Sequence, residues 1–160
     1  VNMAPDTVIR LAQEHENIIG VKEASGFPQQ AEQITSAELP KDFVVLSGDD
    51  ALTVAFVQNG AQGVISVVGN AYPRLTSRLT HLAMQGRYNE ADMLQTAMRQ
   101  INTQLFQEGN PAGIKALLRL MCLIDSDTLR LPLVPVSEEL RVRLDETRKE
   151  LDLYASTIGC

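Results

Sequence analysis

Three short apolar stretches alternate with segments of helical periodicity over the first 70 residues of the chain. Each stretch is rich in β-branched residues and ends at Gly, Ser or Asn, which is typical of a buried strand in an α/β sheet. Strands are predicted near residues 18–24, 43–48 and 63–68. Helices are predicted over Pro5–His15, Gln29–Glu38 and Ala51–Gln58. This alternation predicts three adjacent parallel strands with helical crossovers, and their apolar character on both sides predicts that helices cover the sheet.

After residue 70 the pattern is helical only. Helices are predicted over Pro73–Gln85, Tyr88–Phe106, Ala112–Leu123 and from Ser137 to about Ala155. Residues 128–135 are expected to be extended, because prolines disfavour helix in the residues that precede them. We therefore expect an α/β part over residues 1–86 and a helical extension over residues 87–160.

One charged residue interrupts the first apolar stretch. Side chains alternate along a strand, so Lys22 is expected on the same face as Gly20, while Glu23 lies on the opposite face. Lysine is rarely buried unless it is paired or used. Lys22 also falls near the carboxyl end of its strand, where α/β folds place their sites.

Two interpretations of Lys22 follow, and the strand alone does not decide between them. Desolvation disfavours an ammonium group, and the neutral amine can attack a carbonyl carbon. Gly20, on the same face, would then leave room for a small ligand. Alternatively, Lys22 protects an edge strand or pairs with a neighbouring acid.

The ends of the other two stretches carry similar alternatives. Ser47-Gly48-Asp49-Asp50 has the residues of a helix N-cap, but the backbone around Gly48 could instead approach a ligand. Ile65 lies within the third stretch, where a β-branched side chain normally belongs to the core. Only its backbone could serve a ligand.

Composition narrows the classes of function. The chain has 160 residues, 44% hydrophobic and 21% charged, with 14 basic and 20 acidic side chains and a formal net charge of -6. No basic run is present, so nucleic acid and anionic membrane surfaces are not expected partners. No apolar stretch is long enough to span a bilayer. The two cysteines form neither a zinc spacing nor a disulfide framework, which favours a reducing cytoplasm, and no motif indicates a metal or a cofactor.

Several motifs together resemble the dihydrodipicolinate synthase family. They are Gly20-Val21-Lys22-Glu23-Ala24-Ser25-Gly26, Leu46-Ser47-Gly48-Asp49-Asp50, Gly63-Val64-Ile65-Ser66-Val67, Asn110-Pro111 and Asp127-Thr128-Leu129-Arg130-Leu131-Pro132. They occur in the family's order and cover essentially the whole chain. The resemblance implies an α/β fold, the C-terminal part of a (β/α)8 TIM barrel with three parallel strands, followed by a C-terminal helical extension.

The resemblance also implies an activity. It is the condensation of pyruvate with L-aspartate 4-semialdehyde through a lysine Schiff base, giving 4-hydroxy-tetrahydrodipicolinate for lysine and diaminopimelate biosynthesis. On this basis Lys22 would form the imine, Ile65 would offer its backbone to pyruvate, and Gly48 would line the pocket. No metal and no cofactor are expected, and the cysteines favour the cytoplasm. The family implies a homo-oligomer, either a tetramer or a dimer.

The chain departs from the family pattern in ways that leave alternatives open. The family's proton-relay tyrosine, its carboxylate-binding arginine and a threonine pair would precede the first residue, and Tyr72, Tyr88 and Tyr154 stand in other contexts. Gly113 stands where the family commonly has a second proline. We therefore expect about the last half of such an enzyme. The alternatives are an N-acetylneuraminate or keto-deoxy-sugar aldolase of the same superfamily, and a catalytically incompetent fragment that acts only as a scaffold or assembly unit.

Overall fold

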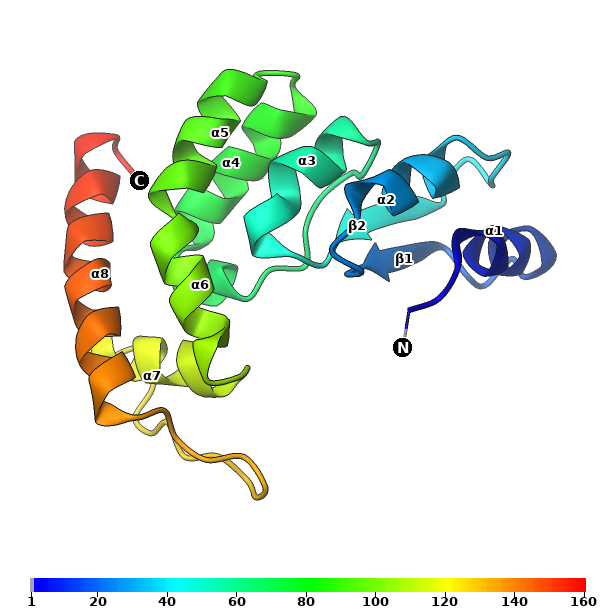
Figure 1. The fold of residues 1–160 in the computed structure, drawn as a ribbon. Coiled ribbons are helices and arrows are strands. Elements are labelled where there is room, and N and C mark those ends of the chain that lie inside the picture. Colours follow the sequence, from blue (N-terminus) through cyan, green and yellow to red (C-terminus); the bar gives the residue numbers. More distant parts are fainter. Residues whose placement is uncertain (1) are drawn as a thin grey trace. The chain divides into compact units, whose positions relative to one another are not determined.

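The computed structural model describes residues 2–160, and the chain divides into two compact units (Figure 1). The first unit comprises Val1–Ser66 and Leu79–Asp92, and the second comprises Val67–Arg78 and Met93–Cys160. The first unit holds the sheet, whereas the second is built from helices.

The sheet of the first unit consists of two parallel strands. Strand β1 (Gly20–Glu23) pairs with β2 (Val44–Ser47), and Lys22 lies opposite Leu46. The third predicted stretch joins β2 through one parallel bridge, between Ser47 and Val64. The predicted parallel direction and neighbour order are therefore confirmed where pairing exists.

The extent of the third strand was predicted wrongly. Only Val64 pairs with β2, and Val68–Asn70 forms the short 3-10 helix η2 instead. The physical reason lies at Val67, whose φ of -88° and ψ of -51° are helical, so the backbone leaves the extended conformation there. The first two strands are also shorter than the predicted ranges 18–24 and 43–48.

Helices of the first unit cover one face of the sheet. They are α1 (Pro5–Glu14), α2 (Pro28–Thr35), the 3-10 helix η1 (Asp50–Leu52) and α3 (Thr53–Gln58). A proline begins each of α1 and α2, where its missing N–H costs nothing. The buried core is formed by Val8, Ala12, Ala31, Ile34, Phe43, Val45, Phe56 and Ala61. Ile18 and Val21 pack against this core from the sheet side.

Burial of both faces of the sheet, which the sequence predicted, is wrong for the residues that the structure describes. Lys22 and Ala24 are exposed on the face opposite the helices. Ile65 is 45% exposed. Helices α2 and α3, which follow β1 and β2, both pack on the core side of the sheet, so the apolar character of these strands is matched by helix packing on that side.

The second unit is formed by helices that pack on one another. Two helices, α4 (Pro73–Met84) and α5 (Tyr88–Ala97), each belong partly to it. It also contains α6 (Arg99–Gln107), α7 (Ala112–Leu120) and α8 (Glu138–Thr157), which pack mutually. The single helix predicted over 88–106 is interrupted at Met98, where ψ is -3°. The sequence predicted a boundary at residue 86 between the barrel part and the helical extension. The two units described above do not test that boundary, so it stays a prediction.

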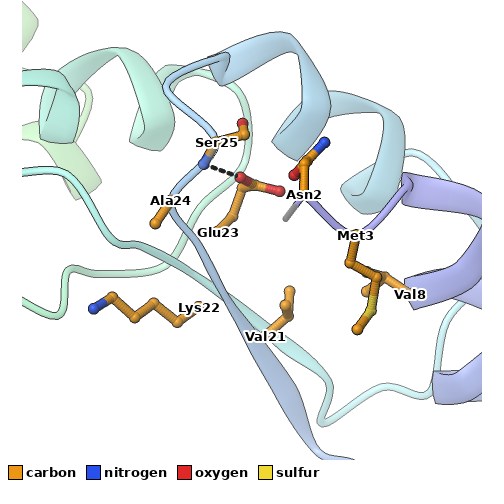
Figure 2. Close-up of a pocket in the computed structure, with 8 residues that line it drawn as sticks. All are labelled: Asn2, Met3, Val8, Val21, Lys22, Glu23, Ala24 and Ser25. Atoms are coloured by element: carbon orange, nitrogen blue, oxygen red, sulfur yellow. Dashed lines mark hydrogen bonds between the residues drawn. The ribbon is translucent and has the colours of Figure 1, made fainter.

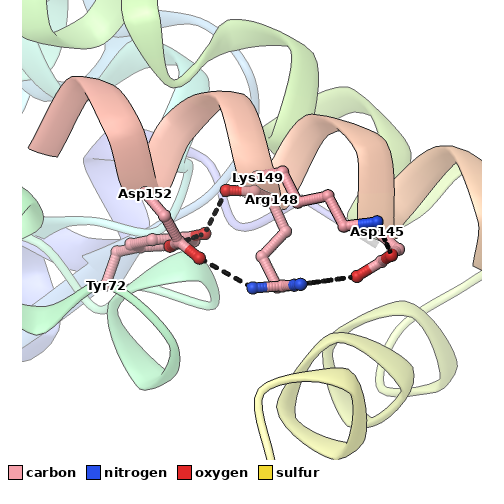
Figure 3. Close-up of polar contacts among 5 residues, drawn as sticks. All are labelled: Tyr72, Asp145, Arg148, Lys149 and Asp152. Carbon is pink, nitrogen blue, oxygen red and sulfur yellow. Dashed lines mark hydrogen bonds and ion pairs between the residues drawn. The ribbon is translucent and has the colours of Figure 1, made fainter.

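A polar network joins Tyr72 to α8 within the second unit (Figure 3). The Tyr72 hydroxyl donates to Asp152 Oδ1 at 2.9 Å, and Arg148 bridges Asp152 at 2.8 Å and Asp145 at 2.7 Å. Burial, followed by the bond to Asp152, raises the pKa of Tyr72 above its ordinary value. Hydrogen bonds from Lys149 and Arg148 lower the pKa of Asp145. The network thereby fixes Tyr72 with its hydroxyl already engaged.

The edge of β1 generates a first prediction. Among residues 2–160, β1 pairs only with β2, and Ile19 just before it is 69% exposed. An unpaired strand edge with apolar neighbours associates with other chains. We therefore expect the 160-residue chain to self-associate in sedimentation experiments as its concentration rises, and Ile19→Lys to weaken that association.

Leu153 supplies the matched control, because it lies on α8 and is 68% exposed. Leu153→Lys adds the same charge at nearly the same exposure and should leave the association unchanged. A monomer at all concentrations, with slow amide exchange along residues 18–24, would contradict the prediction.

Candidate active site

Lys22 is the third residue of β1 and points away from the neighbouring Glu23 (Figure 2). The alternation predicted for the strand is therefore confirmed. Lys22 is exposed, whereas Glu23 is only 4% exposed. The desolvation of Lys22 in an intact enzyme therefore stays a prediction, because residues 2–160 leave its side chain exposed. Lys22 is nevertheless the only lysine that residues 2–160 place in a strand.

Gly48 lies against the Lys22 side chain. A Cβ built on Gly48 would come within 2.8 Å of Lys22 Cε and 2.5 Å of Ala24 Cβ, closer than real Cβ atoms approach their neighbours. The Gly48 N–H donates to the Glu23 carbonyl oxygen at 2.7 Å, which continues the pairing of β2 with β1. Glycine at this position therefore allows the end of β2 to touch the lysine.

Ile65 occupies the next segment on the same face. The bridge between Ser47 and Val64 sets the register, and one residue further along both segments Gly48 is level with Ile65. The Ile65 N–H donates to the Ser47 carbonyl oxygen at 2.8 Å, which continues the pairing of this segment with β2. The structure thus brings all three predicted site residues, Lys22, Gly48 and Ile65, to one face of the first unit.

Gly20 has a different role from the predicted one. A Cβ on Gly20 would lie 2.7 Å from both the Cγ2 and the carbonyl oxygen of Val44. Its missing side chain therefore allows β1 and β2 to approach each other. The prediction that it leaves room for a ligand is wrong.

Capping explains Asp49, the first of the two acids that follow Gly48. The Asp49 carboxylate accepts a hydrogen bond from the Ala51 N–H at 2.8 Å and caps η1. Ser47 is fully buried, and its hydroxyl donates to the Asp49 carbonyl oxygen at 3.0 Å. The capping interpretation is therefore confirmed. These contacts also hold the turn that presents Gly48.

Sequence reasoning missed one residue of this region. The Glu23 carboxylate accepts hydrogen bonds from the Ser25 N–H at 2.6 Å and from Gln30 Nε2 at 2.5 Å (Figure 2 shows the first). The available signal was an acidic residue on the helix-facing side of an apolar strand, where a charge is costly unless it is paired or hydrogen-bonded.

A cavity of about 440 Å³ adjoins β1 (Figure 2). It is lined by Asn2, Met3, Val8, Val21, Lys22, Glu23, Ala24 and Ser25. This volume falls within the range of small-molecule sites. Its lining comes from both faces of β1, since the Lys22 side chain points away from Glu23, Asn2 and Met3 (Figure 2).

Residues 2–160 contain no group of three or more His, Cys, Asp or Glu side chains arranged to hold a metal ion. None of their helices combines the length and the apolar character that a membrane crossing requires. Cys122 and Cys160 are both free thiols.

Comparison with known sequences identifies relatives over nearly the whole chain. The model of the dihydrodipicolinate synthetase family matches residues 1–151. A 4-hydroxy-tetrahydrodipicolinate synthase of Porphyromonas gingivalis is 46% identical over 152 residues, covering 95% of this chain and 51% of the relative. The enzyme of the same name from Phocaeicola vulgatus is 45% identical, covering 92% of this chain and 50% of the relative.

Solved structures agree with these sequence matches. The 4-hydroxy-tetrahydrodipicolinate synthase of Methylacidiphilum fumariolicum SolV superposes with a TM-score of 0.91 at 38% identity, over 99% of this chain and 52% of that one. The chloride-inhibited dihydrodipicolinate synthase of Acinetobacter baumannii, complexed with pyruvate, gives a TM-score of 0.88 at 34% identity, over 95% and 51%.

The chain spans about half the length of the curated relatives that it matches. Within that span, the parallel β1–β2 pair belongs to the relatives' TIM-barrel fold. The family model covers all three segments that carry Lys22, Gly48 and Ile65. This chain is therefore a member of the dihydrodipicolinate synthetase family.

Proposed function

We propose that this chain carries the Schiff-base lysine of a pyruvate-dependent lyase that makes 4-hydroxy-tetrahydrodipicolinate from pyruvate and L-aspartate 4-semialdehyde. The observation that supports the proposal most is the contact between the Lys22 side chain and Gly48 at the carboxyl ends of two parallel strands. The relatives bear the name of this activity, and one of them was solved with pyruvate.

The proposed chemistry begins at Lys22 Nζ. The neutral amine attacks the C2 carbonyl of pyruvate, and loss of water leaves an imine. The imine withdraws electrons from the methyl carbon, which loses a proton and then bonds to the aldehyde carbon of the second substrate. The amine of that substrate displaces Nζ as the ring closes, which regenerates Lys22.

The other groups of the site have positional roles in this scheme. Gly48 lines the pocket beside the lysine, and Ile65 offers its backbone to the bound pyruvate. The Tyr72 hydroxyl is engaged by Asp152, so the proton relay is assigned to a group outside these 160 residues. Since Lys22 is exposed here, the proposal also assigns its desolvation to that additional part of the enzyme.

The proposal extends to the state of the whole enzyme. It is a cytoplasmic homo-oligomer, a tetramer or a dimer, without metal or cofactor and without nucleic-acid or membrane partners. Two free cysteines and the acidic balance of the chain are consistent with that assignment.

A sister aldolase acting on N-acetylneuraminate or keto-deoxy sugars would share the lysine and pyruvate. A substrate panel on the full-length enzyme separates these functions, because only the proposed one consumes aspartate semialdehyde. Turnover of a sugar acid in its place would overturn the choice of second substrate while leaving the imine chemistry intact.

Trapping the imine tests the proposed role of Lys22. In the full-length enzyme, pyruvate followed by borohydride should leave a reduced adduct on Lys22 alone, because reduction fixes the imine carbon to Nζ. Lys22→Arg should abolish the adduct, since a guanidinium forms no imine at neutral pH. Peptide mass mapping locates the adduct.

Lys41→Arg, in an exposed loop, is the matched control and should label normally. The 160-residue chain alone should label slowly and show no turnover. An adduct on another lysine, or none in an active enzyme, would refute the Schiff-base role.

Gly48→Ala tests the contact with the lysine. The added Cβ would press on Lys22 Cε and Ala24 Cβ. We expect imine formation to slow by about 10- to 100-fold, the size of effect that a displacement near 1 Å produces at a reacting group. Rapid-quench trapping with borohydride measures the rate.

Ala24→Gly in the same protein removes the other half of the clash and should restore part of the rate. A Gly48→Ala enzyme with an unchanged rate would show that Gly48 does not shape the position of the lysine.

A further inference from the structure

Glu23 is the residue next to Lys22, and the Schiff-base scheme gives it no task. Its side chain lies on the helix-facing side of β1 and is 4% exposed. Burying a carboxylate costs free energy unless hydrogen bonds compensate. Both of its oxygens have such bonds, and both donors are N–H groups, so the site is built for a carboxylate.

The contacts of Glu23 reach two other segments. One oxygen accepts from the Ser25 N–H at 2.6 Å, which closes the turn after β1. The other accepts from Gln30 Nε2 at 2.5 Å, which ties the strand end to α2. Gln30 is itself fixed by the segment before α1: its Oε1 accepts from Asn2 Nδ2 at 2.8 Å, and its Nε2 lies 3.2 Å from the Met3 carbonyl oxygen.

These segments line the cavity beside β1, and Lys22 is also among its lining residues. Asn2, Met3, Glu23 and Ser25 all line it (Figure 2). On the other side of Glu23, its backbone carbonyl accepts from the Gly48 N–H at 2.7 Å. Glu23 therefore joins the strand that carries the lysine, the turn after it, helix α2 and the segment before α1.

We propose that Glu23 is a positioning residue for the lysine: its buried carboxylate, through Ser25, Gln30 and Asn2, fixes the end of β1 and so the direction of the Lys22 side chain. A lysine side chain has four rotatable bonds, so the position of Nζ depends on a fixed position of the Lys22 backbone. A shift of the Lys22 backbone by about 1 Å is enough to slow a reaction at Nζ by about 100-fold. This inference rests on the proposed function of Lys22.

The direction of the hydrogen bond from Gln30 to Glu23 suggests two single variants and one double variant that test the proposal. In Glu23→Gln, an amide N–H₂ faces Gln30 Nε2, so two donors oppose each other unless Gln30 turns and loses its bond from Asn2 Nδ2. In Gln30→Glu, two carboxylates oppose each other. The double variant reverses the pair: the new amide at 23 donates to the new carboxylate at 30, its oxygen accepts from Ser25, and the carboxylate accepts from Asn2.

The test compares these variants in the full-length enzyme by the rate of borohydride-trapped imine formation at saturating pyruvate. Each single variant should form the imine about 10-fold more slowly or worse, with the half-saturating pyruvate concentration changed less than about 3-fold, because the lysine is misdirected rather than the ligand lost. The double variant should recover most of the rate. Glu32→Gln, an equal charge change at an exposed position of α2, is the control and should match the parent enzyme.

Thermal stability and amide exchange at Ser25 are followed in the same proteins. Single variants that lose stability but keep the imine rate, or a double variant that regains stability without regaining the rate, would reduce Glu23 to a structural role and overturn the inference. Lys22→Arg separates the two proposals. If that variant still gives the adduct, the Schiff-base function fails; if it does not, unchanged rates in the Glu23 variants refute the positioning role alone.

Discussion

The site depends on the close parallel pairing of β1 and β2. Two glycines make this pairing possible: Gly20 lets the strands approach at their amino ends, and Gly48 lets the end of β2 touch Lys22 and Ala24. The parallel register then brings Lys22, Gly48 and Ile65 to one face, because residues level with one another in a parallel sheet face the same way. Side chains at either glycine would clash with neighbouring atoms, so the reactive amine and its neighbours depend on backbone proximity.

The opposite side of the same strand carries the burial that stabilises it. Val21 packs on the helical core, and Glu23 uses both carboxylate oxygens within the protein. Strand β1 thus has one exposed face, which carries Lys22, and one face that packs against the helices, which carries Val21 and Glu23. This difference between the two faces explains how Lys22 remains exposed in residues 2–160 while the pairing of β1 with β2 holds its backbone.

The sequence predicted the parallel order of the strands, because apolar stretches that alternate with helical segments are a local signal. The site roles of Lys22, Gly48 and Ile65 came from the resemblance to the family, and they stay predictions. The sequence did not predict that the third stretch turns into η2 after a single bridge, since Val67 and Val68 have strand-like side chains and only their backbone angles reveal the turn. It also misjudged Gly20, whose role depends on Val44 across the sheet. Glu23 was missed because its bond from Gln30, which is in turn bonded to Asn2, joins separate segments and no spacing along the chain reveals it.

The central claim is that Lys22 bonds covalently to pyruvate beside Gly48 and Ile65. A crystal structure of the full-length enzyme soaked with pyruvate tests this most directly. We expect continuous density from Lys22 Nζ to C2 of pyruvate, with the ligand in contact with Gly48 and with the backbone of Ile65. Pyruvate bound elsewhere, or joined to another lysine while Lys22 stays free, would contradict it.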